Sequence, residues 1–176
     1  MSKVIRESGV SFGPFEDEQI FHIEESSIYK QMGQGIKTVE FIYAYNENGI
    51  VNLLEAKTSC PNAANKFLDK EHEVSFDNFF DDVTHKVMDS VDILLVSILG
   101  RYNAKGEIGL FIRNQCLQNI RLRFILVITS SKADVSWLPA PKAELERRLF
   151  SLRKIWGLEI VVLDRNLAKE KGLIAD

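Results

Sequence analysis

Two runs rich in β-branched and aromatic residues flank a polar turn in the first third of the chain. Lys37–Tyr45 has the sequence KTVEFIYAY, and Ile50–Thr58 has the sequence IVNLLEAKT. The tetrapeptide NENG at positions 46–49 separates them. An Asn-Gly pair between two such runs is a strong hairpin signal. The pattern therefore predicts an antiparallel pair of strands.

A helical period of apolar residues follows. From Ser75 to Leu99 they recur at three- and four-residue steps, which places them on one stripe of a long helix. We expect this stripe to form the main core contact of the helix. Its members are Phe76, Phe79, Phe80, Val83, Val87, Val91, Leu94, Leu95 and Ile98.

The C-terminal half predicts two further strands and one helix. Leu122–Thr129 is a short apolar run typical of a strand buried on both faces. Pro141 opens a helical pattern that runs to Trp156, and Gly157 is placed for a left-handed helix cap. Leu158–Leu163 is the last predicted strand.

The N-terminal part gives weaker patterns. We expect an irregular start up to Gly13-Pro14, a short strand at Gln19–Glu24 and a helical turn at Ser27–Met32 that Gly33 ends. The residues between Leu99 and Leu122 are expected to form a polar connection. Together the elements predict an α/β (α+β) fold, in which a mixed β-sheet is flanked by helices within one domain over residues 1–176.

Composition supports one globular domain. The chain has 176 residues, 45% of them hydrophobic, and its formal net charge is −3. The longest apolar stretch, Ile93–Leu99, is far below the roughly 20 residues that cross a bilayer. The first residues lack the apolar centre of a secretory signal, so the expected compartment is the cytoplasm. Cys60 and Cys116 do not form a Cys-x-x-Cys pair, which argues against zinc-ribbon and thioredoxin-like chemistry.

Charge is unevenly distributed along the sequence. Residues 1–90 contain 8 Lys/Arg and 16 Asp/Glu, and residues 91–176 contain 14 Lys/Arg and 9 Asp/Glu. An acidic half that can hold a cation and a basic half that can hold phosphates suit a nucleic-acid enzyme. Solvated helix faces explain the same imbalance without any function.

The tripeptide Glu55-Ala56-Lys57 is the main candidate for chemistry. Because side chains alternate along a strand, Glu55 and Lys57 lie on the same face. They end an otherwise apolar strand, where an unpaired charge is costly. In the predicted hairpin, Glu40 falls opposite Lys57 with a two-residue turn and opposite Glu55 with a four-residue loop, and it shares their face in either register. A three-residue loop would move Glu40 to the other face.

Two carboxylates beside an ammonium have two interpretations. They form either an ion pair with a spare acid, or a site in which the acids bind Mg²⁺ or Mn²⁺. An acid on one strand, a turn, and acid-x-Lys at the end of the next strand resemble the PD-(D/E)xK (restriction-endonuclease-like) nuclease superfamily. The resemblance implies that Glu40 and Glu55 hold the metal and that Lys57 assists the attack of water, within a nuclease-like core of about residues 19–163. Glu40 stands where the superfamily usually has Asp.

An upstream acid often completes such sites, and the resemblance makes Glu24 or Glu25 a candidate for that role. The expected function is divalent-metal-dependent cleavage of DNA or RNA, with Arg121, Arg123, Arg147 and Arg148 as possible backbone contacts. The alternatives are a catalytically inactive nuclease-fold module that binds a protein or a nucleic acid, and an unrelated α/β domain in which Glu55 and Lys57 form a structural pair.

Overall fold

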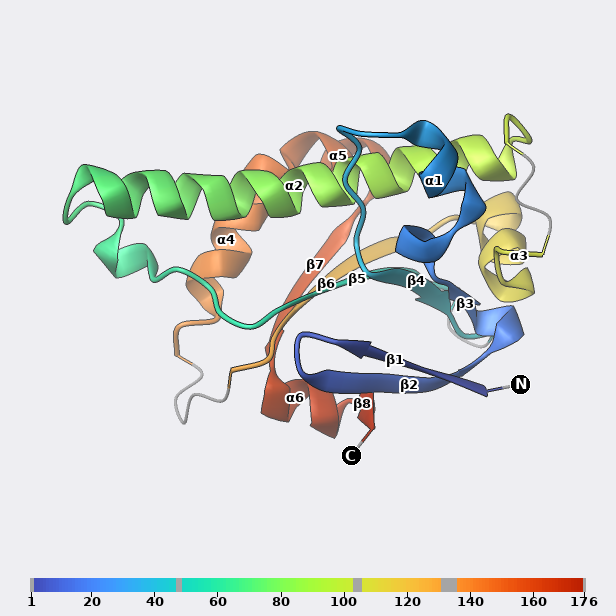
Figure 1. Ribbon diagram of the computed structural model, residues 1–176, viewed down its shortest axis with the longest axis horizontal. Coiled ribbons are helices and arrows are strands. Elements are labelled where there is room, and N and C mark those ends of the chain that lie inside the picture. The colour runs from blue at the N-terminus through green and yellow to red at the C-terminus, as the bar shows by residue number, and fades with distance from the viewer. Residues whose placement is uncertain (1, 47–48, 103–105, 131–135, 176) are drawn as a thin grey trace.

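The structure, a computed structural model, describes residues 2–46, 49–102, 106–130 and 136–175. A five-stranded sheet lies between a long helix on one face and a small second sheet on the other (Figure 1). The predicted turn residues Glu47 and Asn48 lie outside the described residues. The chain is therefore an α+β protein, as the pattern of elements predicts.

The central sheet is mixed, with the strand order β3-β4-β5-β6-β7. The first three strands pair antiparallel, and β5, β6 and β7 pair parallel. Its strands are β3 (Ile20–Phe21), β4 (Phe41–Ala44), β5 (Val51–Lys57), β6 (Leu122–Ile128) and β7 (Glu159–Asp164). The predicted hairpin, the buried strand at Leu122 and the last strand are confirmed. A specifically restriction-endonuclease-like topology stays a prediction.

The helix α2 (Lys70–Ile98) crosses one face of the sheet (Figure 1). Phe80, Val83, Val87 and Leu94 are fully buried there, against alternate residues of β4, β5, β6 and β7. The helix begins five residues before the predicted start at Ser75. Asp69 caps it by accepting a hydrogen bond from the backbone N–H of His72 at 2.9 Å.

The other helices are shorter. They are α1 (Ser27–Met32), α3 (Leu110–Gln118), α4 (Pro139–Arg148), α5 (Phe150–Trp156) and α6 (Arg165–Glu170), with 3₁₀ turns η1 (Asp17–Gln19), η2 (Ile23–Glu25) and η3 (Ala63–Asn65). Gly33 ends α1 and Gly157 ends α5 with a positive φ, as predicted. The predicted helix from Pro141 to Trp156 is divided at Leu149, where the backbone leaves helical geometry.

The irregular N-terminal start is a wrong prediction. β1 (Ser2–Glu7) and β2 (Val10–Glu16) form a hairpin, and β8 (Ile174–Ala175) pairs with β2 to complete a three-stranded sheet. Phe12 and Phe15 are fully buried against Phe41 and Tyr43 of the central sheet. This second core is on the sheet face opposite α2, so both faces of the central sheet are covered.

Two strand predictions were too long. Residues 37–39 are not part of β4, because the backbone N–H groups of Lys37 and Val39 donate to Asp89 and Ser90 of α2 instead of to a strand. The predicted strand Gln19–Glu24 is reduced to β3, since the turn η2 follows it at once.

The helix α3 lies in the part of the chain that was expected to be a polar connection. Its sequence LFIRNQCLQ has a weak apolar stripe, in which Ile112 is the residue that becomes fully buried. Within the described ranges, none of the helices is long and apolar enough to cross a membrane.

Candidate functional site

The register of the β4–β5 hairpin places the predicted site residues on one face. Phe41 pairs with Leu54 and Ala44 pairs with Val51, which is the register of a four-residue loop. One step further along this register, Glu40 stands opposite Glu55, and the Glu40 backbone N–H donates to Leu54 O at 3.1 Å. Strand alternation turns Glu40, Glu55 and Lys57 toward α2, on the face of Ile42 and Leu53.

Glu55 is a fully buried carboxylate with two ammonium neighbours. Its side chain has 0% exposure, and its Oε1 atom accepts a hydrogen bond from Lys86 Nζ at 2.8 Å and lies 3.1 Å from Lys57 Nζ. Its Oε2 atom is buried with no hydrogen-bond partner among the described residues. Burial raises the pKa of Glu55, and the charges of Lys86 and Lys57 oppose that rise.

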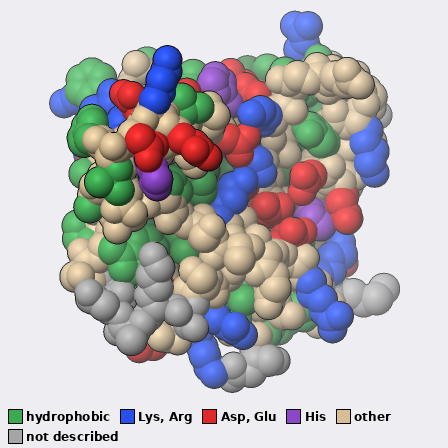
Figure 2. Space-filling model, turned by 60° about the vertical axis from the view of Figure 1, so that its left-hand side comes forward, with side chains coloured by type: hydrophobic (Ala, Val, Ile, Leu, Met, Phe, Trp, Pro, Cys, Tyr) green, Lys and Arg blue, Asp and Glu red, His purple; other side chains and the backbone are tan. Residues whose placement is uncertain are grey.

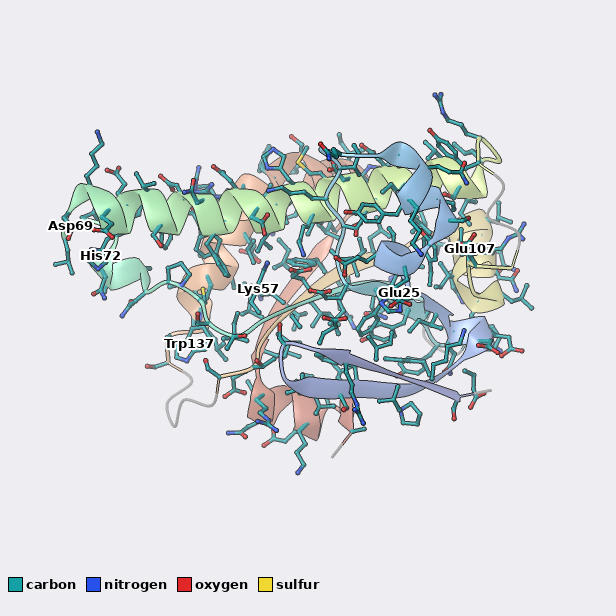
Figure 3. The ribbon with its side chains drawn as sticks, viewed as in Figure 1. Glu25, Lys57, Asp69, His72, Glu107 and Trp137 are labelled. Atoms are coloured by element: carbon teal, nitrogen blue, oxygen red, sulfur yellow. The ribbon has the colours of Figure 1, made fainter. Side chains whose placement is uncertain are left out.

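Lys57 joins the site to the surface. Its ammonium lies between Glu55 and Asp82 of α2, 3.2 Å from Asp82 Oδ2, and about a quarter of its side chain is exposed. Asp82 also accepts a hydrogen bond from Lys37 at 2.7 Å. Burial acts to raise the pKa of Asp82, but the hydrogen bonds from Lys37 and Lys57 lower it overall. Figure 3 shows Lys57 below α2, near the centre of the molecule.

Lys86 is a site residue that the sequence analysis missed. It comes from α2, lies 2.8 Å from Glu55 Oε1 and 3.9 Å from Glu40 Oε1, and has 16% of its side chain exposed. Burial acts to lower the pKa of Lys86, but Glu55 and Glu40 raise it overall. A signal was present, because Lys86 follows the buried Val83 by three residues and so lies on the apolar stripe of the helix.

Glu40 also lies close to two further acids. One carboxylate oxygen each from Glu7, Glu24 and Glu40 lies within 4.8 Å of the others. Glu24, the upstream acid that the resemblance implies, therefore does reach Glu40. Burial and the negative charge of Glu55 raise the pKa of Glu40 to about 8, because both disfavour its ionised form.

Glu7 reaches this group through the N-terminal hairpin. The turn that follows Glu7 is fastened to the end of the central sheet, because Ser8 Oγ donates to Ala56 O at 3.0 Å and Thr129 Oγ1 donates to Ser8 O at 2.7 Å. No sequence pattern near Glu7 predicted that it would lie close to Glu24 and Glu40. This proximity depends on the packing of the N-terminal hairpin against the central sheet, which includes the hydrogen bond between Ser8 and Thr129, 121 residues apart.

An open pocket of about 720 Å³ adjoins the Glu7 side of this group. Glu7 is one of its lining residues, with Arg6 of β1 and with His22 and Glu25, whose side chains lie 3.3 Å apart. Figure 3 shows Glu25 between α1 and the β1–β2 hairpin. The acid group is thus reachable from solvent on its Glu7 side.

The four arginines named as possible backbone contacts all form ion pairs. Arg123 donates to Glu159 at 2.7 Å and 2.8 Å, and Arg121 lies 3.8 Å from the same carboxylate. Arg147 and Arg148 both bind Glu144. Figure 2 shows a face where acidic side chains gather around a histidine, with lysines and arginines beside them, so its charge is mixed.

Comparisons with protein-family models, with curated proteins and with solved structures found no match. The arguments for function therefore come from the site itself. The arrangement offers carboxylate oxygens for a hard cation, the mostly buried Lys86, which balances the charge of Glu55, and the more exposed Lys57 at the edge of the site.

Proposed function

We propose that the chain is a divalent-metal-dependent phosphodiesterase of the PD-(D/E)xK type that cleaves DNA or RNA. The observation that carries the proposal is the gathering of Glu40, Glu55 and Lys57 on one sheet face beside α2. Glu24 adds a third carboxylate within reach of Glu40. Glu55 and Lys57 lie in β5 and Glu40 directly precedes β4, in the order in which the superfamily resemblance has its acids and its lysine.

The residues suit Mg²⁺ or Mn²⁺, which prefer carboxylate oxygens. Glu40, Glu55 and Glu24 would hold the ion, and the buried Oε2 atom of Glu55 still lacks a partner among the described residues. When bound, such an ion lowers the pKa of water and stabilises negative charge on a phosphate. Two neighbouring carboxylates repel an anionic substrate until a cation offsets their charge.

The two lysines have different roles in this proposal. Lys86 is mostly buried and keeps Glu55 in place through a 2.8 Å hydrogen bond, so it is a positioning residue. Lys57 is partly exposed and can turn its ammonium from Asp82 toward a bound phosphate, where it stabilises the charge that develops during cleavage. We therefore expect Lys57 to contribute to turnover more than to folding.

Cleavage assays on labelled single-stranded DNA, duplex DNA and RNA test the proposal. We expect cleavage with Mg²⁺ or Mn²⁺, none with EDTA, and a loss of at least about 100-fold in Lys57→Met and Glu55→Gln, as for removal of a transition-state contact. The control Lys142→Met changes an exposed lysine of α4 and should retain activity within about twofold. Cleavage that persists in EDTA, or in both site variants, would exclude this mechanism.

A non-catalytic binding module for a protein or nucleic-acid partner is the second candidate. The position of Lys86 favours it, because this ammonium already supplies a positive charge to Glu55 and lies 3.9 Å from Glu40. A module of this kind would bind labelled nucleic acid or a protein equally well with and without EDTA. Stable binding without cleavage under every metal condition would support it over the nuclease.

A further inference from the structure

The strand β1 has one free edge. In the small sheet it pairs with β2 on one side and with no described strand on the other. The two-residue turn Ser8-Gly9 sets Glu7 opposite Val10, and the closing pair of such a turn exchanges two hydrogen bonds. Bonded and non-bonded pairs then alternate, so the backbone N–H and C=O groups of Arg6 point away from β2. The free edge thus offers a backbone donor and a backbone acceptor.

The pocket of about 720 Å³ follows this free edge. Its described lining includes every residue from Lys3 to Glu7 of β1. The other wall comes from the end of η2 and from the segment before α3, with Glu25, Ser26 and Glu107. Figure 3 shows Glu25 and Glu107 on the β1 side of the hairpin. The pocket is therefore a groove with a strand edge along one wall, called the β1 groove below.

The shape of the β1 groove favours one kind of occupant. The edge of a sheet binds an extended backbone, which adds a strand through main-chain hydrogen bonds. The wall on the η2 side leaves room for one extended segment and hinders the approach of a whole folded domain. At about 3.3 Å per residue, the stretch Lys3–Glu7 is matched by about five residues of such a segment.

The charge of the β1 groove is negative. Its described lining has one lysine and one arginine against four carboxylates, those of Glu7, Asp17, Glu25 and Glu107. The lysine, Lys3, is already paired with Asp17 at 2.8 Å. His22 also lines the groove and lies 3.3 Å from Glu25. A segment that carries lysine or arginine side chains complements this charge.

Val4 adds an apolar position on the same edge. It lines the groove and is 51% exposed, although it belongs to a strand. A neighbour on an added strand packs best against it with a β-branched or aromatic side chain. A segment in which basic and β-branched residues alternate therefore suits both the carboxylates and Val4.

We propose that the β1 groove binds an extended basic peptide segment of a partner protein, which joins β1 as a further strand of the small sheet. The backbone of the segment pairs with the outward N–H and C=O groups of Arg6. Its basic side chains lie near the carboxylates of Glu25 and Glu107. This binding goes beyond the proposed cleavage and requires neither a metal nor a nucleic acid.

Fluorescence anisotropy with the full chain tests the groove, with a labelled heptapeptide of alternating lysine and valine as the probe. We expect this peptide to bind at least about tenfold more tightly than a heptapeptide of alternating glutamate and valine, because the carboxylates of the groove repel the second. A peptide that adds a strand should also slow amide hydrogen exchange at Arg6 by at least about tenfold when it saturates the groove.

A pair of variants at Arg6 separates the backbone from the charge. Arg6→Pro removes the outward N–H group without removing a bond to β2, and should weaken binding of the lysine-valine peptide at least about tenfold. Arg6→Ala is the matched control, since it removes the same charge and keeps the N–H group. It should bind the peptide within about twofold of the wild type or more tightly.

Four results would overturn the inference: no binding of the lysine-valine peptide, equal binding of both peptides, equal affinity of Arg6→Ala and Arg6→Pro, or unchanged exchange at Arg6. Thermal melts check folding, and the exchange measurement on the wild type decides if Arg6→Pro does not fold. A second copy of the chain at this edge would give a dimer in sedimentation velocity that Arg6→Pro dissociates. That result would also overturn the peptide proposal.

Discussion

Glu55 depends on two lysines that differ in burial. Lys86 has 16% of its side chain exposed, and its Nζ atom lies 2.8 Å from Glu55 Oε1. Lys57 has 27% exposed, its Nζ atom lies 3.1 Å from the same oxygen, and it also binds Asp82. Removal of one partner from a buried ion pair leaves an uncompensated charge, whereas a partly solvated pair such as Lys57–Asp82 contributes less. The two lysines should therefore differ in their importance for stability.

We expect Lys86→Met to lower the free energy of unfolding by about 3 kcal/mol and Lys57→Met by about 1 kcal/mol. Urea unfolding followed by circular dichroism measures both. In the double variant Glu55→Gln/Lys86→Met, the cost should be smaller than the sum of the single costs, because no buried charge remains unpaired. A larger cost for Lys57→Met than for Lys86→Met would contradict this account.

Residue alternation in the hairpin predicted that Glu55 and Lys57 share a face, and that Glu40 joins them if the turn has two or four residues. It could not choose between two turn lengths, and the observed register sets Glu40 opposite Glu55. Lys86 and Glu7 were not predicted, because their contacts depend on how a helix and a distant hairpin pack against the sheet. Local pattern carries no information on such pairs.

At the scale of elements, Arg148 connects α4 to α2. Its guanidinium binds Glu144 within α4 and reaches Asp77 and Asp81 of α2, with 11% of the side chain exposed. Hydrogen bonds from Arg147 and Arg148 lower the pKa of Glu144 to about 2. A carboxyl group whose pKa falls on folding stabilises the protein above its ordinary pKa near 4.5 and loses that effect as the pH falls toward 2.

Glu144→Gln should therefore be less stable than the wild type at pH 7, and the difference should shrink as the pH falls from 4.5 toward 2. Urea midpoints of both proteins at pH 7, 4 and 3 measure it. Glu146→Gln is the control, since its carboxylate forms a longer contact with Arg153, at 3.8 Å. A stability difference that does not depend on pH would show that Glu144 acts through packing instead of charge.

Two glycines hold elements in place for different reasons. Gly109 precedes α3, and a Cβ atom there would lie 2.5 Å from Glu18 O, whereas Gly157 has an open surrounding but a φ of +63°. We expect Gly109→Ala to cost about 2–3 kcal/mol through overlap with backbone and Gly157→Ala about 1 kcal/mol through the left-handed conformation. Thermal melts compare them. Equal losses would argue that η1 moves away from α3.

Strong periodicity decided which elements could be predicted. The stripe of α2 and the apolar strands β5, β6 and β7 gave clear signals because each buries a regular set of side chains. The stripe of α3 is weak, and β8 has only two residues. Such elements exist because their neighbours support them, so a short sequence window does not reveal them.

At the scale of the whole molecule, the β1–β2 hairpin is fastened to the central sheet at its turn. Thr129→Val removes the hydrogen bond from Thr129 Oγ1 to Ser8 O. We expect amide hydrogen exchange in β1 and β2 to become faster by about fivefold, as for the loss of roughly 1 kcal/mol of local stability, with β5 and β6 unaffected. Thr84→Val is the control.

Thr84 is suited to that comparison because its buried hydroxyl has no hydrogen-bond partner within the described ranges. Its removal leaves a group of similar shape and breaks no bond, so exchange in the hairpin should stay as in the wild type. Equal acceleration in both variants, or faster exchange throughout the sheet, would mean that the Ser8 contact does not act locally.

The pairing of β2 with β8 joins two segments from opposite parts of the chain. Ser11 and Phe12 pair with Ala175 and Ile174, and the backbone N–H of Gly13 donates to Leu173 O at 3.1 Å. Ribosomes make residue 7 long before residue 174. Until β8 has been made, this edge of β2 lacks its partner, and until residue 129 has been made, the turn after Glu7 lacks its hydrogen bond from Thr129. A nascent chain that ends before Thr129 would thus carry Glu7, Glu24 and Glu40 without one of the hydrogen bonds that fix the turn after Glu7.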